Sequence, residues 1–188
     1  MGFTRAHLMT YRDASVPDLV GPGLRLLFVG INPGLWTAAT QTHFAFPGNR
    51  FYPALVAAGI LDELPDFANG MTDADRAAFT ARGLGVSNFV NRATARADEL
   101  SREEFRAGAE RLRENVRAWK PRVVAVLGLG AYREGFGQPK AARGRQPEPL
   151  EGAELWLLPN PSPLNGHESV ASLAAAYAEP ARAAGIIP

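Results

Sequence analysis

Asn32 is the residue of this 188-residue chain whose type and setting point most directly to chemistry. It follows the apolar run Leu24–Val29 and lies in the turn Gly30–Gly34, GINPG. Pro33 disfavours helical backbone at Asn32, and the flanking glycines let backbone approach a ligand closely. A neutral amide is no general base near pH 7, but it can donate and accept hydrogen bonds. The turn predicts an amide that recognises a ligand or orients a water molecule; an ordinary turn with a capping asparagine is the alternative.

An aromatic ring is the second candidate for ligand contact. The segment 35–48 after the turn is expected to be a loop, and it carries several aromatic residues. Phe44 can offer a ring face to a flat ligand, since stacking of a base on an aromatic side chain is worth roughly 1–3 kcal/mol. Phe46 is instead expected to pack beneath the loop. The interpretation therefore pairs Asn32 with Phe44.

Buried strands and amphipathic helices alternate along the chain and must position these residues. Apolar runs predict strands at 24–29, 85–90, 122–128 and 155–158. Helices are expected from Asn49 to Gly59, from the Thr-x-x-Asp start at Thr72 and Asp75 to Arg82, from the capping box Ser101–Glu104 to Trp119, from Ala131, and from Ser169 to at least Tyr177. Short turns between such elements predict an α/β fold of three layers, α/β/α, with a central four-stranded parallel sheet.

Polar residues follow three of the predicted strands. Asn32 and Asn160 each precede a proline at a strand end, and Asn88 lies at the end of the strand 85–90. In open parallel sheets, ligands bind in the crevice beyond the carboxyl ends of the strands. We therefore expect all three amides at one rim, although a turn residue is an equally good reading of Asn88.

Composition limits the chemistry further. The chain has no cysteine, which excludes disulfides, iron–sulfur clusters and thiolate zinc sites, and its three histidines are too scattered to suggest a metal site. Gly128 and Gly130 lack the third glycine of a dinucleotide fingerprint, since Arg133 occupies its place. No metal and no cofactor are expected.

Length indicates one domain, and the net charge indicates no strong overall electrostatic attraction to a charged partner. Residues 1–22 show no clear period and are expected to form a loose N-terminal arm, followed by a single domain over 23–188. Twenty basic and nineteen acidic residues give a net charge of +1. The basic segment Arg133–Arg145 could contact phosphates or be a solvated loop. No stretch has the length of a membrane span or the apolar core of a signal peptide, so a cytoplasmic protein is expected.

Three stretches together resemble the mismatch-specific uracil-DNA glycosylases, a group that includes the thymine-DNA glycosylases. They are Gly30–Leu35, Phe44–Phe51 and Asn160–Ser162, and the resemblance extends from Gly23 to about Tyr177. It implies a member of the uracil-DNA glycosylase superfamily that removes damaged or mispaired bases from double-stranded DNA. A monomer is expected.

The resemblance assigns roles to residues around the first turn. Asn32 matches the residue that positions the hydrolytic water, and Phe44 matches the aromatic residue that stacks on the flipped base. The backbone near Ile31 matches the part that reads the base edge. Thr37 falls where a small or hydroxyl residue lines the pocket, and His43 falls where the animal thymine-specific enzymes also carry histidine.

The resemblance also implies a loop, Asn160–His167, that enters the duplex. Leu164 matches the wedge residue, and the alternative is that it packs inward against the last helix. The sequence departs from the pattern at Pro163, where related bacterial enzymes have glycine, and at Gly166–His167, which replaces an arginine. The DNA contacts predicted here are Asn160, Ser162, Pro163, Leu164, Asn165 and His167.

The reaction that the resemblance implies is hydrolysis of the bond between uracil and deoxyribose, best in mispairs with guanine, with xanthine, ethenocytosine and thymine as further candidate bases. Asn88 is the candidate for reading or stabilising the leaving base. The motif has no lysine to form a Schiff base, so a monofunctional enzyme is expected. The carboxylates Asp98 and Glu99 precede a helix, where acids are favourable, and are expected to be structural. A non-catalytic module that binds mismatched or abasic DNA and a nucleoside hydrolase are the competing hypotheses.

Overall fold

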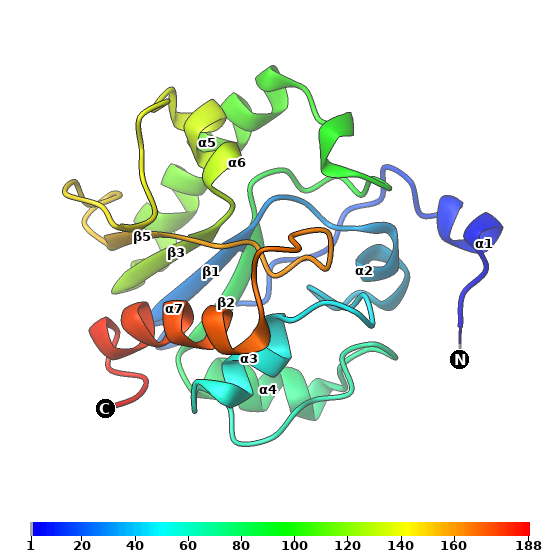
Figure 1. Ribbon diagram of the computed structural model, residues 1–188, viewed down its shortest axis with the longest axis horizontal. Helices are drawn as coiled ribbons and strands as arrows, with labels where there is room; N and C mark the ends of the chain where they lie inside the picture. Colours follow the sequence, from blue (N-terminus) through cyan, green and yellow to red (C-terminus); the bar gives the residue numbers. More distant parts are fainter. Residues whose placement is uncertain (1) are drawn as a thin grey trace.

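The computed structural model describes residues 2–188 as a sheet with helices on both faces (Figure 1). The strands are β1 (Leu26–Gly30), β2 (Leu84–Asn88), β3 (Val123–Leu127), β4 (Gly144–Arg145) and β5 (Glu154–Leu158). The helices are α1 (Arg5–Met9), α2 (Leu35–Thr40), α3 (Phe51–Ala57), α4 (Asp73–Ala81), α5 (Arg102–Trp119), α6 (Leu129–Phe136) and α7 (Val170–Ala183), with a 3-10 helix, η1, at Ala97–Glu99. The spatial order of the strands is β2-β1-β3-β5-β4.

The predicted three-layer fold is confirmed, with one correction to the sheet. β1, β2, β3 and β5 are parallel, but β4 is a fifth strand that runs antiparallel to β5 at the edge. The expectation of four strands, all parallel, was therefore wrong in this respect. β4 has only two residues, Gly144 and Arg145, and neither gives the apolar pattern from which a strand is predicted.

Alternating residues of the parallel strands serve two separate cores. Leu26 and Phe28 of β1 pack with α3, α4 and α7, whereas Leu27 and Val29 pack with α5 and α6. Both faces of the sheet are therefore covered (Figure 1), which explains why the strands read as continuous apolar runs. The carboxyl ends of β1 and β2 are aligned, because Gly30 is the register partner of Asn88.

Helix starts follow the predicted capping signals closely. The capping boxes predicted at Thr72 and Ser101 are present, and Ser169 caps α7. α3 begins at Phe51 rather than directly after Asn49, whose Oδ1 accepts a hydrogen bond from the Phe51 N–H at 2.9 Å. These caps fix where the connecting loops begin.

The segment 35–48 was wrongly expected to be entirely loop, because its first six residues form α2. Gly34 is the N-cap of this helix, and the indole N–H of Trp36 donates to the carbonyl of Ala68 at 2.9 Å. A helix this short has little intrinsic stability, so tertiary contacts rather than propensity decide its formation.

The N-terminal segment is attached to the domain and is not the loose arm that we expected. Leu19 forms an antiparallel bridge with Val86 of β2, the Asp13 N–H donates to the carbonyl of Ala93, and Val16 is buried. β2 is an edge strand, and its unpaired backbone at Val86 provides the partner of Leu19. The boundary of the domain at residue 23 remains a prediction.

Two absences apply to the described chain. Across residues 2–188, no helix is long and apolar enough to cross a membrane. The same residues bring together no three histidine, cysteine, aspartate or glutamate side chains that could hold a metal ion.

Two helical glycines should respond oppositely to alanine. A Cβ at Gly108 of α5 would overlap the carbonyl oxygen of Phe89, whereas a Cβ at Gly130 of α6 would meet nothing within 4 Å. We expect Gly108→Ala to lower the free energy of unfolding by about 2 kcal/mol or more. Gly130→Ala should raise it by about 0.5 kcal/mol, since alanine loses less entropy in a helix. Urea unfolding measures both, and similar effects of the two changes would contradict this account of the packing between α5 and β2.

Candidate functional site

The side chain of Asn32 is held by its amide nitrogen. Nδ2 donates to the Arg92 carbonyl at 2.9 Å, to Thr94 Oγ1 at 2.8 Å and to the Pro33 carbonyl at 3.1 Å. Asn32 Oδ1 has no hydrogen-bond partner among residues 2–188, and it is not among the fully buried polar atoms. The helix that follows is capped by Gly34 without a side-chain bond, so the alternative of a capping asparagine is excluded. The geometry leaves one oriented acceptor that can receive an O–H from a water molecule.

Ion pairs anchor the segment that holds Asn32. The guanidinium of Arg92 donates to both carboxylate oxygens of Glu104, at 2.6 and 3.1 Å, and to Asp13 Oδ1 at 2.8 Å. Hydrogen bonds from Arg92 lower the pKa of Glu104 from 4.5 to about 2. Thr94 Oγ1 donates its own proton to the Arg96 carbonyl, which leaves it an acceptor for Asn32. The orientation of the Asn32 amide is therefore supported from α5 and from the N-terminal segment.

Gly30 lies where an amide and an aromatic ring meet. A Cβ at this position would be 2.6 Å from Asn88 Oδ1 and 3.1 Å from Phe44 Cζ. The half-buried ring of Phe44, whose φ is +56°, stacks on Phe51 with a centroid distance of 4.2 Å. The absence of a side chain at Gly30 therefore lets bare backbone, a carbonyl-type acceptor and a ring edge surround one point, two residues from Asn32.

His43 fixes the orientation of Asn88. The ring is buried, with Nε2 2.9 Å from the Pro17 carbonyl and Nδ1 3.2 Å from Asn88 Nδ2. A carbonyl can only accept, so Nε2 carries the proton, and Nδ1, which faces the amide nitrogen of Asn88, accepts from it. Burial lowers the pKa of His43, which favours the same neutral ring. Asn88 Oδ1 has no hydrogen-bond partner in the described chain. It is not fully buried, because the one fully buried side-chain polar atom without a partner there is Ser87 Oγ. Asn88 Oδ1 is therefore an accessible acceptor with a fixed direction.

The other predicted pocket residues have more limited roles. The side chain of Ile31 packs on the opposite core, against Gly128, and its carbonyl accepts from the Val90 N–H. Thr37 is a buried residue of α2. The structure thus brings together Phe44, Asn88 and His43, directs the Ile31 side chain away from Phe44, and leaves Thr37 without a hydrogen bond to any of them.

The loop 160–168 is folded by its own amides. Asn160 Oδ1 accepts from the Ser162 N–H at 2.9 Å, and Asn165 Nδ2 donates to the Asn160 carbonyl at 3.0 Å. Leu164 is 88% exposed at the tip, so the alternative that it packs inward is wrong. Pro163 and His167 are also exposed, whereas Ser162 and Asn165 are half-buried. An exposed leucine on an internally bonded loop is suited to insertion between bases.

Phe46 was wrongly expected to be packed beneath its loop, because it is 48% exposed. Its ring meets Trp36 edge to face at 6.0 Å and lies 3.1 Å from the position of a Cβ on Gly48; Pro163 lies 3.7 Å from that same position. Phe46 therefore borders the loop that carries Leu164. The sequence offered only an ambiguous signal, since an aromatic residue before proline fits both a buried and an exposed site.

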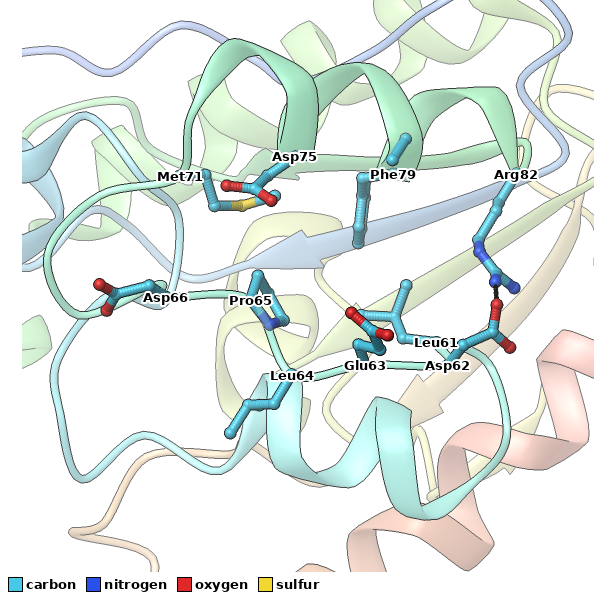
Figure 2. A pocket seen from close by; sticks show the side chains of 11 residues that line it. Leu61, Asp62, Glu63, Leu64, Pro65, Asp66, Met71, Asp75, Phe79 and Arg82 are labelled. Atoms are coloured by element: carbon cyan, nitrogen blue, oxygen red, sulfur yellow. Dashed lines mark hydrogen bonds and ion pairs between the residues drawn. The ribbon is translucent and has the colours of Figure 1, made fainter.

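Two cavities of about 420 Å³ each lie outside this group of residues. One lies beside α4, with Phe79 on its floor and Asp62, Glu63, Asp66 and Asp75 among its lining residues (Figure 2). This excess of carboxylates disfavours contact with DNA phosphates. The other is lined by the basic segment, in which Arg143 pairs with Glu168 and Arg145 with Glu154. These ion pairs favour a structural role for the two arginines. Asp98 and Glu99 precede α5, as expected, but lie in a 3-10 helix of their own, η1, and they pair with Arg96 and Arg12, respectively.

The fold and this arrangement define an α/β protein with a polar and aromatic site at the carboxyl ends of β1 and β2. Residues 17–180 match the Uracil DNA glycosylase superfamily, so the chain belongs to that superfamily. Its members are DNA glycosylases, which hydrolyse N-glycosidic bonds. A similar fold is found in a solution NMR structure from Methanosarcina acetivorans, a candidate uracil DNA glycosylase. The TM-score is 0.59 at 16% sequence identity, and the match covers 88% of this chain and 96% of that one.

The Arg92–Glu104 pair should make stability depend on acidic pH. The Glu104 carboxyl has a pKa of about 2 when folded and an ordinary value near 4.5 when unfolded, so its stabilisation is complete above pH 4.5 and is lost as the pH falls towards 2. Glu104→Gln should lower the free energy of unfolding by about 1–2 kcal/mol at pH 7. Its difference from the wild type should shrink below pH 4.5. Glu103→Gln, at an exposed neighbouring position, is the control. A difference that does not vary with pH would refute the assignment.

His43 should impose a second pH dependence at higher pH. Because burial lowers its pKa, the unfolded state binds the proton more readily, and stability should fall as the pH drops below 6.5. One proton contributes a slope of at most about 1.4 kcal/mol per pH unit. His43→Gln should remove this slope, while His167→Gln, at an exposed position, should keep it. Chemical unfolding between pH 5 and 7.5 measures the slopes, and equal slopes in all three proteins would exclude the neutral buried ring.

Proposed function

We propose that the protein is a monofunctional DNA glycosylase of the mismatch-specific and thymine-DNA glycosylase group. It removes uracil from DNA, preferentially opposite guanine, in base excision repair. The observation that carries the proposal is the pair of asparagines with fixed nitrogens and accessible oxygens: Asn88, which meets the Phe44 ring at Gly30, and Asn32, two residues further along the same turn. One oxygen suits a water molecule, and the other suits a base.

Recognition of the base follows from the direction of Asn88. A uracil turned out of the duplex would stack on Phe44 and donate its N3–H to Asn88 Oδ1. Cytosine has an unprotonated N3. This nitrogen would face Asn88 Oδ1, and two acceptors form no hydrogen bond. Leaving a buried polar pair unmatched costs about 1–3 kcal/mol, so this single contact favours uracil over cytosine. Xanthine and thymine also carry a ring N–H and remain candidate bases. Ethenocytosine remains one only through other contacts, because its N3 carries no proton.

Hydrolysis requires water to be held over the sugar. As the bond between C1′ and the base nitrogen lengthens, the sugar gains oxocarbenium character and the base departs as an anion. The water molecule that donates a hydrogen bond to Asn32 Oδ1 then adds to C1′ and releases a proton to solvent. A neutral amide supplies orientation rather than basicity, so the rate depends on positioning and on the quality of the leaving group. A slow enzyme that works best on good leaving groups is expected.

Access to a base inside a duplex requires flipping, at a cost of a few kcal/mol that is lower for a mispair. Leu164 is proposed to fill the vacated stack from the loop 160–168, and the exposed edge of Phe46 is proposed to lie against the same groove. The motif residues include no lysine, so no covalent adduct with DNA is expected, and borohydride should trap none. We propose that Asn160 and Asn165 fold the loop. The sugar-phosphate backbone of the DNA is proposed to be contacted by Ser162, Pro163 and His167.

Asn32→Ala should lower single-turnover release of uracil by about 100-fold, because water is no longer positioned. Binding to duplex containing an abasic analogue should change less than about threefold, since the DNA contacts lie elsewhere. Asn69→Ala, beside the acidic cavity, is the matched control and should behave like the wild type. Equal activity of the Asn32 variant and the wild type would reject the role of Asn32.

The two competing functions are tested with the same duplex. A wild-type protein that binds a mispair but forms no abasic site at enzyme excess would be a binding module rather than an enzyme. Release of uracil from free deoxyuridine would instead indicate a nucleoside hydrolase, which has no use for an exposed leucine on a loop.

A further inference from the structure

Arg50 is the most heavily bonded side chain next to the loop 160–168. It lies at the N-cap of α3 and is half-buried. Its Nε donates to the Pro161 carbonyl at 3.4 Å, Nη1 donates to the Glu168 carbonyl, and Nη2 donates to the carbonyls of Ser162 and Asn165, the last at 2.9 Å. Its backbone N–H donates to the Pro161 carbonyl at 3.2 Å. One residue therefore binds both ends and the middle of the loop.

The bonding pattern requires a guanidinium. Four carbonyls converge on three nitrogen atoms that lie in one plane, a geometry that matches the fixed fork of arginine. A lysine at position 50 would present one nitrogen with three donors, which cannot bond to all four carbonyls at once. Arg50 forms no ion pair within residues 2–188, so its charge is satisfied by carbonyl dipoles of the loop.

The same residue joins the loop to the base pocket. Phe51 follows Arg50 and stacks on Phe44, the ring proposed to receive the base. Leu164 lies at the other end of this connection, on the loop whose carbonyls Arg50 binds, with 88% of its surface exposed. A loop held before DNA arrives need not lose its conformational freedom on binding, which favours insertion of its tip.

We propose that Arg50 is a positioning residue for base flipping, which holds the loop 160–168 in the shape that presents Leu164 to the duplex. The proposal rests on the proposed function only in taking DNA as the partner. Arg50 acts through the loop and touches neither the base nor the sugar. Its contribution should therefore appear when a base must be extracted from a stack and disappear when no stack exists.

The test compares uracil opposite guanine in a duplex with uracil in an unpaired bubble, under single-turnover conditions. Arg50→Lys should lower the rate about tenfold on the duplex and less than about twofold on the bubble. Leu164→Ala should show the same contrast, and adding Arg50→Lys to it should have little further effect, because both changes remove one function. Arg82→Lys is the matched control, since Arg82 also donates to a backbone carbonyl, that of Ile60, but beside the acidic cavity (Figure 2). It should leave both rates unchanged.

A merely structural role gives a different pattern. If Arg50 only stabilises the start of α3, Arg50→Lys should lower both rates equally, and its effect should add to that of Leu164→Ala. Either result would overturn the proposal.

A second measurement does not depend on catalysis. 2-Aminopurine beside a tetrahydrofuran abasic analogue becomes fluorescent when the wedge unstacks it, and Arg50→Lys should at least halve the increase at saturating protein. An unchanged increase would also overturn the proposal. A wild-type protein that releases no uracil from either DNA would reject the proposed function alone and leave this readout to decide the role of Arg50.

Discussion

The packing of two side chains against a residue that has none is the constraint on which the site depends. Gly30 is the register partner of Asn88, and the space that a Cβ would take is occupied by Asn88 Oδ1 and by the edge of Phe44. Parallel pairing sets the register, and the two apolar cores hold the strands in it. The ring and the amide can therefore face one ligand only because position 30 carries no side-chain atom.

Partners that can only accept determine the direction of both asparagines. Backbone carbonyls and Thr94 Oγ1 accept hydrogen bonds from the amide nitrogen of Asn32, and the unprotonated Nδ1 of His43 accepts one from that of Asn88. An amide with its nitrogen engaged in this way must present its oxygen. The same rule thus orients two free oxygens, one proposed to hold a water molecule and one proposed to bind a base, at the cost of burying a histidine whose Nε2 proton is bound by the Pro17 carbonyl.

The sequence predicted the parts of the fold that depend on local pattern. Apolar runs marked the four parallel strands, and the pairs at Thr72 and Ser101 marked helix starts, because burial on both faces and capping leave signals within a few residues. Both Asn-Pro turns follow parallel strands, β1 and β5, so their residues lie at the same edge of the sheet, and the sharing of one site by Asn32 and Asn160 stays a prediction.

The features that were missed depend on distant partners. The strand β4 pairs only through β5, the segment around Leu19 is ordered by the free edge of β2, and α2 is stabilised by contacts such as that of Trp36 with Ala68. Arg50 belongs to the same class, since its four acceptors lie more than a hundred residues away in the chain. A motif can place such a residue beside the site, but only the folded chain shows which groups it binds.

Charge explains why preorganisation matters for this protein. The net charge is +1, many arginines are already paired with carboxylates, and one face carries an acidic cavity, so general attraction to DNA phosphates is weak. In the proposed function, discrimination then comes from contacts made only at a lesion, namely insertion of Leu164 and capture of a flipped base. Such contacts are strongest when the loop and the pocket already have their bound shapes, because ordering them on the DNA would consume the same free energy that distinguishes a mispair from a normal pair. A guanidinium satisfied by loop carbonyls serves this need better than one exposed to phosphates, since it contributes shape without raising affinity for undamaged DNA.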